Sequence, residues 1–592
     1  MDVNNLCISK NGQFYKLNSA LSKASIERTF KEISKERVGN YLLNEVKQNL
    51  TTSTNIPVTY SVAAFKIESE PSFLTNTATT EHKYAYLLLI EYSDALVVFK
   101  KYVEIPDKVF DRFIGEYDYE KFCHLHGQQK PSYERVTMKN MSVSNVEIRS
   151  RSLEAKRLNG ILPSNSSSRS IPSNFRMKIG QEVYTITPST ARISFRDGRV
   201  SLEELVDWGN SMKEEIKTTI NSSEFLDNFA APIILKDVFD KGHELIAVLF
   251  DLGELEEKFK LGVLTFNKPG VSGVVPFSGK ENLKLLDFFR APLLVDGNEL
   301  KSRWLGLDSQ LKFTNKLITL KSKPLASITL SEDGKPDRTL ASYLNKEKPF
   351  SAVFNNPSYS YYSRSCFEDK AMLNNLSAIL NVFNETIDFT SVLTEKEKPH
   401  ASTLNRFPST SLFRAVEDNY CHNHDIVICD DMNDEWADHI AIDHSSNTPS
   451  ISFIHSKFTK KDTYGASAFH EVVAQALKNI GRTQADKSLY ETKYNRDWSG
   501  TYEGTNIERI RGAQNWNDIE NALDAVSGNP NSVKKIILAT PFLKKSKLAT
   551  ELNKLAQGQQ ARPHYVQLVW LLNSFISSCK DFGVQAHILC KP

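Results

Sequence analysis

Polar residues near the ends of two apolar, strand-like runs have the types and spacing that metal-dependent chemistry needs. Ala437–Ile442 reads as a strand with Asp438 near its start. Ile451–Lys457 reads as the next strand, and its period of two places His455 and Lys457 on one face. If the two strands form a hairpin, Asp438 lies beside that pair. A divalent cation, its carboxylate ligands and a nearby lysine are the groups that hydrolyse a phosphodiester bond.

A predicted helix follows, beginning near Ser467. At about 100° per residue, its polar side chains fall within roughly 60° of one another. This stripe consists of Glu471, Gln475, Lys478 and Arg482. The opposite side is apolar and can pack on the sheet. The stripe can therefore border the site or follow a nucleic-acid backbone.

These positions give a specific set of candidate residues. Asp438 and Glu471 are the candidate ligands for Mg²⁺ or Mn²⁺. The candidate catalytic residues are Glu435, Asp438, His455, Lys457 and Gln475. Asp438 is expected to be the main ligand and Lys457 to orient the water or offset phosphate charge. Glu435 and Glu471 are alternatives for completing the metal site, because histidine is a poor Mg²⁺ ligand, although it binds Mn²⁺ or acts as a base.

The elements around these residues predict an α/β (α+β) domain. Ile426–Cys429 reads as a strand before the acidic stretch. Further strands and helices are expected at Trp516–Val526, Val533–Thr540, Lys544–Ala556, Val566–Cys579 and Val584–Cys590. Their order predicts one mixed sheet flanked by helices. The candidate nucleic-acid contacts are Lys478, Arg482, Lys544, Lys545 and Lys547.

The order Asp438, His455-Ser456-Lys457 and a helix carrying Gln475 resembles the PD-(D/E)xK nuclease superfamily. The stretch is most similar to Mrr-like restriction endonucleases, to antiphage-defence nucleases of the Hachiman A type, and to sporadically distributed proteins of bacterial defence islands. The resemblance implies a restriction-endonuclease-like sheet and a metal-dependent endonuclease acting on DNA, with RNA as an alternative. It also implies that the protein is a prokaryotic antiphage-defence effector. A helicase or sensor protein as partner, and assembly into a homo-oligomer, are both open under this reading.

One position departs from that family. The superfamily usually has Glu or Gln where this chain has His455. The departure leaves open a catalytically degenerate nuclease-like module that binds nucleic acid or assembles a defence complex. A Cys–His hydrolase built on Cys429 and His455 is disfavoured, because Cys429 lies inside an apolar strand and no third orienting group is evident.

The remainder of the chain predicts further domains. Its 592 residues suggest several domains of about 150 residues each. We expect an N-terminal α/β domain over 1–140, a Ser/Asn/Pro-rich linker over 141–175, a middle α/β sensing or nucleic-acid-binding domain over 176–394, and the nuclease-like domain over 395–592. Within these, Ser25–Leu50 reads as a helix, and Ser201 is expected to open another that ends at Thr218.

Composition limits the class of protein. The net charge of +2 excludes a polycation, so any nucleic-acid surface must be a local patch. Seven scattered cysteines without a CxxC pair argue against a zinc ribbon and fit a reducing compartment. The N-terminus lacks a secretory signal pattern, and no apolar run approaches the ~20 residues that span a membrane. A cytoplasmic protein without membrane contact is expected.

Overall fold

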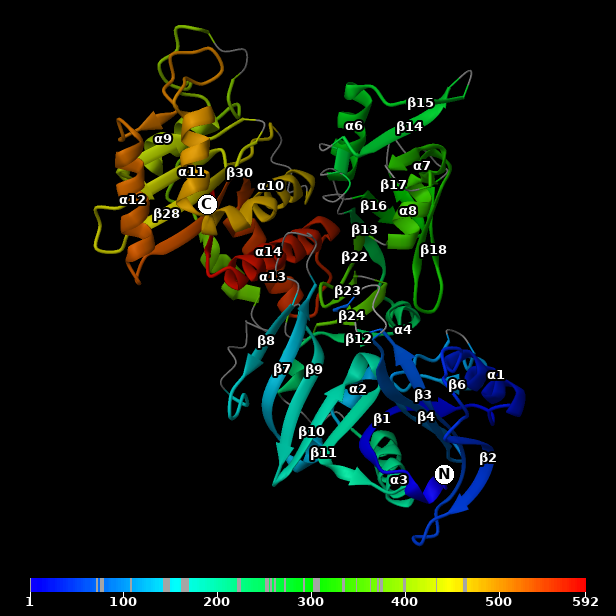
Figure 1. Cartoon of the computed structure of the whole chain (residues 1–592). Coiled ribbons are helices and arrows are strands. Elements are labelled where there is room, and N and C mark those ends of the chain that lie inside the picture. Colours follow the sequence, from blue (N-terminus) through cyan, green and yellow to red (C-terminus); the bar gives the residue numbers. More distant parts are fainter. Residues whose placement is uncertain are drawn as a thin grey trace. The chain divides into compact units, whose positions relative to one another are not determined.

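The computed structural model describes residues 2–592 except for 71–72, 75–78, 107–108, 142–149, 161–169, 221–224, 251–254, 256–257, 260–261, 271–272, 291–292, 302–308, 333–335, 348, 363, 370–371, 373–375, 398–400, 433 and 461–465. The chain is a mixed α/β protein with several sheets, as predicted (Figure 1). It divides into two compact units. One comprises Met1–Lys139, Ser150–Pro163 and Ser170–Ala231, and the other comprises Asn140–Arg149, Ser164–Arg169 and Pro232–Pro592.

The first unit is built on one sheet in the order β2-β3-β4-β5-β1-β11-β10-β9-β7-β8, with β6 beside β1. Its strands are β1 (Ile8–Leu17), β2 (Leu43–Thr51), β3 (Pro57–Ser69), β4 (Glu81–Glu91), β5 (Ala95–Lys101), β6 (Ile114–Gly115), β7 (Ser132–Asn140), β8 (Ser150–Glu154), β9 (Ser170–Ile179), β10 (Glu182–Thr187) and β11 (Arg192–Val200). Its helices are α1 (Lys23–Ile33), α2 (Tyr119–Cys123) and α3 (Leu202–Thr218).

The predicted linker over 141–175 is not where the fold changes. β8 lies inside that range and pairs with β7, and β9 begins inside it and pairs with β10. The first unit therefore continues through α3, instead of ending at 140. Part of the predicted linker, 142–149 and 161–169, lies outside the described residues. The serine- and proline-rich composition indicated a loop, but the pairing of β8 with β7 and of β9 with β10 assigns these strands to the first unit.

Two helix predictions in the first unit have opposite outcomes. Ser201 caps α3 as predicted, because its hydroxyl accepts a hydrogen bond from the Glu204 amide at 3.3 Å. The predicted helix over Ser25–Leu50 is wrong beyond Ile33. Its second half forms β2, which pairs antiparallel with β3.

The second unit begins with two sheets, ordered β12-β24-β23-β22-β13-β16-β17-β18-β19 and β15-β14-β20-β21. Their strands are β12 (Ala231–Ile233), β13 (Leu245–Phe250), β14 (Leu264–Gly270), β15 (Gly273–Pro276), β16 (Leu293–Asp296), β17 (Glu299–Lys301), β18 (Ser309–Phe313), β19 (Ile318–Ser322), β20 (Thr329–Glu332), β21 (Arg338–Thr339), β22 (Phe350–Phe354), β23 (Tyr359–Tyr362) and β24 (Ser365–Glu368). The accompanying helices are α4 (Leu235–Asp240), α6 (Gly279–Arg290), α7 (Lys323–Ser327) and α8 (Leu340–Glu347).

The C-terminal sheet is mixed and runs in the order β25-β31-β30-β28-β27-β26-β29. Its strands are β25 (Phe383–Asn384), β26 (Ile426–Cys429), β27 (His439–Asp443), β28 (Ser450–Ser456), β29 (Ile510–Arg511), β30 (Val533–Lys544) and β31 (Gln585–Lys591). Its helices are α9 (Leu412–Asn419), α10 (Ala466–Asn479), α11 (Lys487–Lys493), α12 (Trp516–Gly528), α13 (Lys545–Ala556) and α14 (Pro563–Asp581). β26, β27 and β28 form an antiparallel meander, and β30 and β31 continue the sheet parallel to β28.

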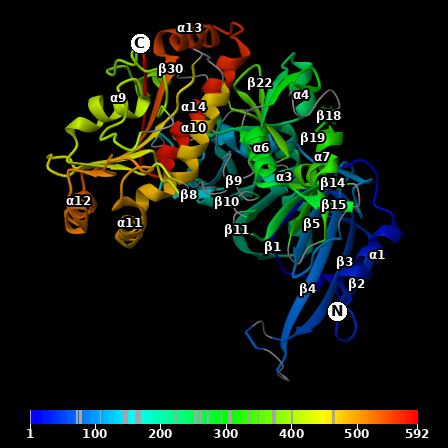
Figure 2. The ribbon, with the colours of Figure 1, turned by 90° about the horizontal axis from the view of Figure 1, so that it is seen from above.

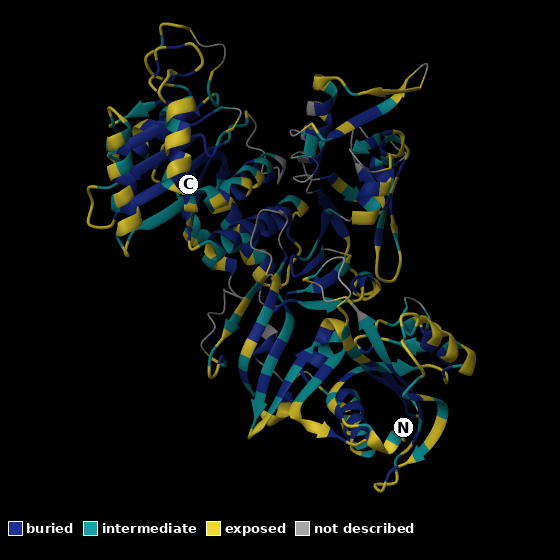
Figure 3. Ribbon diagram, viewed as in Figure 1, coloured by how far each residue is buried: buried dark blue, intermediate teal, exposed yellow. Residues whose placement is uncertain are grey.

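Helices cover both faces of this sheet (Figure 2). One face carries Ile428, Ile440 and Phe453, which share a core with α10, α12, α13 and α14. The other carries Val427 and Ile454, which pack with α9. Figure 3 shows the central strands as buried. This two-faced burial fixes the strand register, because a slip of one residue would exchange the two faces.

Candidate metal centre

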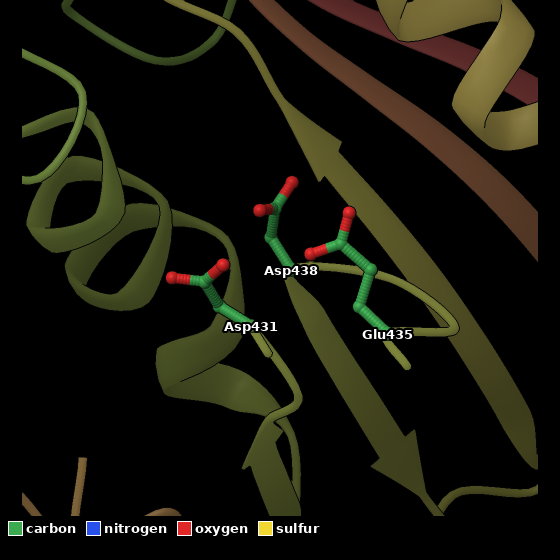
Figure 4. Close-up of side chains that lie close together, drawn as sticks. All are labelled: Asp431, Glu435 and Asp438. Atoms are coloured by element: carbon green, nitrogen blue, oxygen red, sulfur yellow. The ribbon is translucent and has the colours of Figure 1, made fainter. Parts of the chain in front are cut away.

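Three carboxylates meet where β26 turns into β27. Asp431 follows β26, Glu435 lies in the connecting loop, and Asp438 immediately precedes β27 (Figure 4). One oxygen from each lies within 4.8 Å of the others. Carboxylate oxygens are the hard ligands that Mg²⁺ and Mn²⁺ prefer. Of the described residues, this is the one group of three or more Asp, Glu, His or Cys side chains with such spacing.

A buried ion pair holds the loop that carries two of these acids. The Asp430 carboxylate accepts hydrogen bonds from the Lys493 ammonium at 2.8 Å and from the Trp498 indole at 2.7 Å. It also accepts one from the Trp436 amide at 2.7 Å. Asp430 and Lys493 are almost fully buried. These hydrogen bonds attach the β26–β27 loop to α11 and to the π-helical turn Tyr494–Trp498 that follows α11.

Asp431 and Asp438 are oriented by separate donors. The Tyr502 hydroxyl donates to Asp431 Oδ2 at 2.6 Å, and the Lys396 ammonium contacts Asp431 Oδ1 at 2.7 Å. Asp438 Oδ2 accepts a hydrogen bond from the Ser456 amide at 2.7 Å. That amide belongs to the end of β28, which is antiparallel to β27. The predicted hairpin is thus present and brings Asp438 to the end of the next strand.

The three acids perturb one another. Burial raises the pKa of Asp438 well above its usual value, and Glu435 raises it further. Burial, followed by the charge of Asp431, raises the pKa of Glu435 to about 7. The charges of Lys396 and Lys478 act in the opposite direction and lower the pKa of Glu435. Buried carboxylates in contact resist ionising together, and a cation among them would favour the ionised forms.

The structure separates the two predicted metal ligands. Asp438 belongs to the acid cluster, as does Glu435, which was predicted as a catalytic residue and alternative ligand. Glu471 instead lies 2.6 Å from the Lys457 ammonium, in an ion pair between α10 and the end of β28. Glu471 is outside the carboxylate group, so the cluster takes its third acid from Asp431.

His455 lies inside the sheet with little exposed surface. Burial lowers its pKa to about 3, so the imidazole is neutral near pH 7. Strand pairing places His455 and Cys429 on opposite faces, because Cys429 pairs with His439 and His439 pairs with Ile454. Burial also raises the pKa of the Cys429 thiol. This geometry argues against a Cys–His pair.

The helix stripe borders the cluster in part. The apolar side of α10 is buried as expected, with Phe469, Val472 and Ala476 in the core. Gln475 is partly exposed and Lys478 exposed. Lys478 acts electrostatically on Glu435, and the Arg482 guanidinium lies 5.2 Å from the centre of the Trp436 ring, next to Glu435 in sequence.

The predicted lysine patch lies at the end of β30. β30 runs parallel to β28, with Ala539 opposite Ser456, and continues to Lys544. Lys545 forms an ion pair, with its ammonium 3.1 Å from the Glu385 carboxylate. Lys547 lines a surface pocket on α13 and α14 with Thr550, Glu551, Lys554, Arg562 and Tyr565. Glu551 in that pocket is paired with Lys554 at 2.7 Å.

Sequence reasoning missed Asp431, Lys396, Tyr502 and Lys493 as parts of this site. Asp431 had a detectable signal, because it lies two residues after an apolar strand. The other three had none. Lys396 precedes the acid cluster by more than thirty residues and Tyr502 and Lys493 follow it by more than fifty, and only tertiary contacts bring them near.

Within the part of the chain that the structure describes, no helix is long and apolar enough to cross a membrane. Comparison of the chain with protein-family models, curated proteins and solved structures gave no significant match.

Proposed function

We propose that the C-terminal domain is a metal-dependent endonuclease that hydrolyses phosphodiester bonds of DNA, with RNA as the alternative substrate. The observation that carries the proposal is the group of Asp431, Glu435 and Asp438, of which Asp431 and Asp438 are buried and Glu435 partly buried, with one oxygen from each within 4.8 Å of the others at one end of a mixed sheet. A mixed sheet flanked by helices is also the architecture that the resemblance to PD-(D/E)xK nucleases implies.

The donor set fits Mg²⁺ or Mn²⁺. Asp431, Glu435 and Asp438 would hold the cation with oxygen ligands alone, as these ions prefer. A bound cation would polarise the scissile phosphate and lower the pKa of an attacking water. The Ser456 amide and the Tyr502 hydroxyl orient two of the carboxylates, so that the ligand oxygens are positioned before substrate arrives.

Basic residues around the cluster suit an anionic substrate. Lys478 acts electrostatically on Glu435, and the Arg482 guanidinium lies 5.2 Å from the centre of the Trp436 ring, so both are near the acid-bearing loop and each would be able to contact a backbone phosphate. Lys457 follows β28, and its ammonium is paired with Glu471 on α10. Contacts from Lys478 and Arg482 would hold the backbone without reading sequence. A role as an antiphage-defence effector, gated by a helicase or sensor partner, rests on the resemblance alone.

The deciding experiment is cleavage of supercoiled, linear and single-stranded DNA, and of RNA, by the full-length protein with Mg²⁺ or Mn²⁺. Asp438→Asn is expected to abolish cleavage while the protein still folds. Asp443→Asn is the matched control, since Asp443 lies at the other end of β27 and should retain wild-type activity. Equal cleavage by wild type and Asp438→Asn, or none by wild type with either metal, would refute the proposal.

A nucleic-acid-binding or assembly module without catalysis is the second candidate. It is favoured by the neutral, buried His455, where the family usually has Glu or Gln, and by the basic pocket around Lys547, Lys554 and Arg562. In that case no metal supports cleavage. Substitution of Lys547 and Arg562 by glutamine would then weaken DNA binding and reduce its salt dependence.

A further inference from the structure

Lys396 contacts the acid cluster directly, and it is not the lysine that the sequence pattern indicated. The Lys396 ammonium lies 2.7 Å from Asp431 Oδ1, whereas the Lys457 ammonium is held by Glu471 at 2.6 Å. Lys396 also acts electrostatically on both Asp438 and Glu435. Lys457 is not among the largest influences on the pKa of either acid.

The chain holds Lys396 in place from both sides. The Leu412 amide donates to the Thr394 carbonyl at 2.9 Å, and the Phe413 amide donates to the Glu395 carbonyl at 3.2 Å. The Glu395 carboxylate accepts a hydrogen bond from the Phe458 amide at 3.1 Å. Phe458 directly follows Lys457. These bonds attach the segment to the start of α9 and to the end of β28.

The surroundings of Lys396 direct its side chain at the acids. Its ammonium lies 2.7 Å from Asp431 Oδ1 and 4.9 Å from the centre of the Phe413 ring, and the side chain is only 18% exposed. An ammonium of this kind stabilises negative charge.

The cluster carries an excess of negative charge. Its three carboxylates, when ionised, carry −3, and the Lys396 ammonium offsets one of these charges. The Glu395 carboxylate lies 4.0 Å from the same ammonium and adds a further negative charge nearby. The ammonium has three donors, of which Asp431 takes one. The other two can reach an oxygen of a phosphate bound at the same carboxylates.

We propose that Lys396, and not Lys457, is the lysine that contacts the scissile phosphate at the acid cluster. This assignment rests on the proposed nuclease function and specifies which residue stabilises the charge that develops on the phosphate. Lys457 then has a positioning role, holding α10 against the end of β28 through Glu471.

The test separates metal binding from cleavage. Full-length wild type, Lys396→Met, Lys457→Met and Asp438→Asn are titrated with Mn²⁺ by calorimetry and assayed on supercoiled DNA. Lys396→Met should bind Mn²⁺ at least as tightly as wild type, because a competing cation has gone, yet cleave roughly 100-fold more slowly. Lys457→Met should stay within about ten-fold of wild type. A purely structural lysine would not give tighter metal binding with slower cleavage.

The outcomes distinguish the two proposals. Cleavage that depends on Asp438 but is unchanged in Lys396→Met overturns the lysine assignment and leaves the nuclease proposal standing. Weaker Mn²⁺ binding by folded Lys396→Met also overturns it. Absence of cleavage by wild type overturns both. If Lys396→Met does not fold, Lys396→Gln is used, which removes the charge but keeps a polar side chain. Wild-type cleavage by Lys396→Gln rejects the assignment, whereas at least a ten-fold loss with unchanged or tighter Mn²⁺ affinity supports it.

Discussion

Replacing Glu435 with glutamine should stabilise the metal-free protein at alkaline pH. The carboxyl has a pKa of about 7 in the folded chain, against an ordinary value of 4.5, because of burial and the charge of Asp431. Between these values the folded state binds more protons than the unfolded state, so stability falls as pH rises. The penalty is complete above pH 7 and disappears as pH falls to about 4.5.

The size of the effect follows from that difference. A gap of roughly 2.5 pH units, at about 1.4 kcal/mol per unit, corresponds to on the order of 3 kcal/mol. For a domain of this size, that is a rise in Tm of roughly 6–12 °C at pH 8. At pH 5 the glutamine variant and the wild type should melt within about 3 °C of one another.

Tryptophan fluorescence is the suitable probe of this transition. Four of the six tryptophans lie in the C-terminal region, namely Trp436, Trp498, Trp516 and Trp570. Melts are recorded in chelator at pH 5 and pH 8, with Glu491→Gln on the exposed side of α11 as the matched control. Adding Mn²⁺ at about 100 times its Kd should stabilise wild type by ~2.7 kcal/mol and Glu435→Gln by less. A glutamine variant less stable than wild type at pH 8 without metal would show that the carboxylates do not repel one another.

Two other substitutions test the surroundings of the cluster. Lys493→Met leaves the buried Asp430 carboxylate without its countercharge and should destabilise the C-terminal domain by ~3–5 kcal/mol. Arg496→Met removes an exposed ion pair and should destabilise it by less than ~1 kcal/mol, measured by the same fluorescence melt. The wild type should lose stability below pH 6.5, because the folded His455 has a pKa of about 3 and takes up its proton only on unfolding, and His455→Gln should not show this loss. At pH 5.5 the contribution of His455 to the free energy of unfolding is roughly 1.4 kcal/mol. Parallel pH–stability curves for the two proteins would contradict a buried, neutral histidine.

Local patterns predicted the part of the fold that carries the site. Ile426–Cys429 was predicted with its observed bounds, and the strand ending at Ser456 and the start of the helix at Ala466 were placed within a residue. The predicted helical stripe extended to Arg482, whereas α10 ends at Asn479 and Arg482 lies in the 3-10 segment Ile480–Gln484. These elements are buried on defined faces, so their periodicity is unambiguous. The Ser25–Leu50 prediction failed because apolar residues at three- to five-residue spacing also occur in β2, whose conformation is set by pairing with β3.

The site was predicted only where its residues are close in sequence. Asp438 and Glu435 are three residues apart, and both were identified. Lys396 approaches them through bonds from α9 and from the residue after β28, which no local pattern encodes. Lys457 and Glu471 were both predicted to face the site, and the structure pairs them with each other, because two residues of opposite charge can satisfy each other instead of a shared ligand.

His455 stands where the nucleases that this stretch resembles usually have Glu or Gln. His439 pairs with Ile454, so continuing the same register places His455 opposite Asp438. A carboxylate at position 455 would add another negative charge beside Asp438 and Glu435, whose pKa values are already raised. A neutral imidazole at that position avoids this repulsion, while Asp431 and Glu435 supply ligand oxygens from the β26–β27 loop. On this argument His455→Glu, which restores the usual residue, would weaken the metal-free fold and would not be needed for metal binding. The loop residues, and not the strand residue, would then decide whether the domain is active.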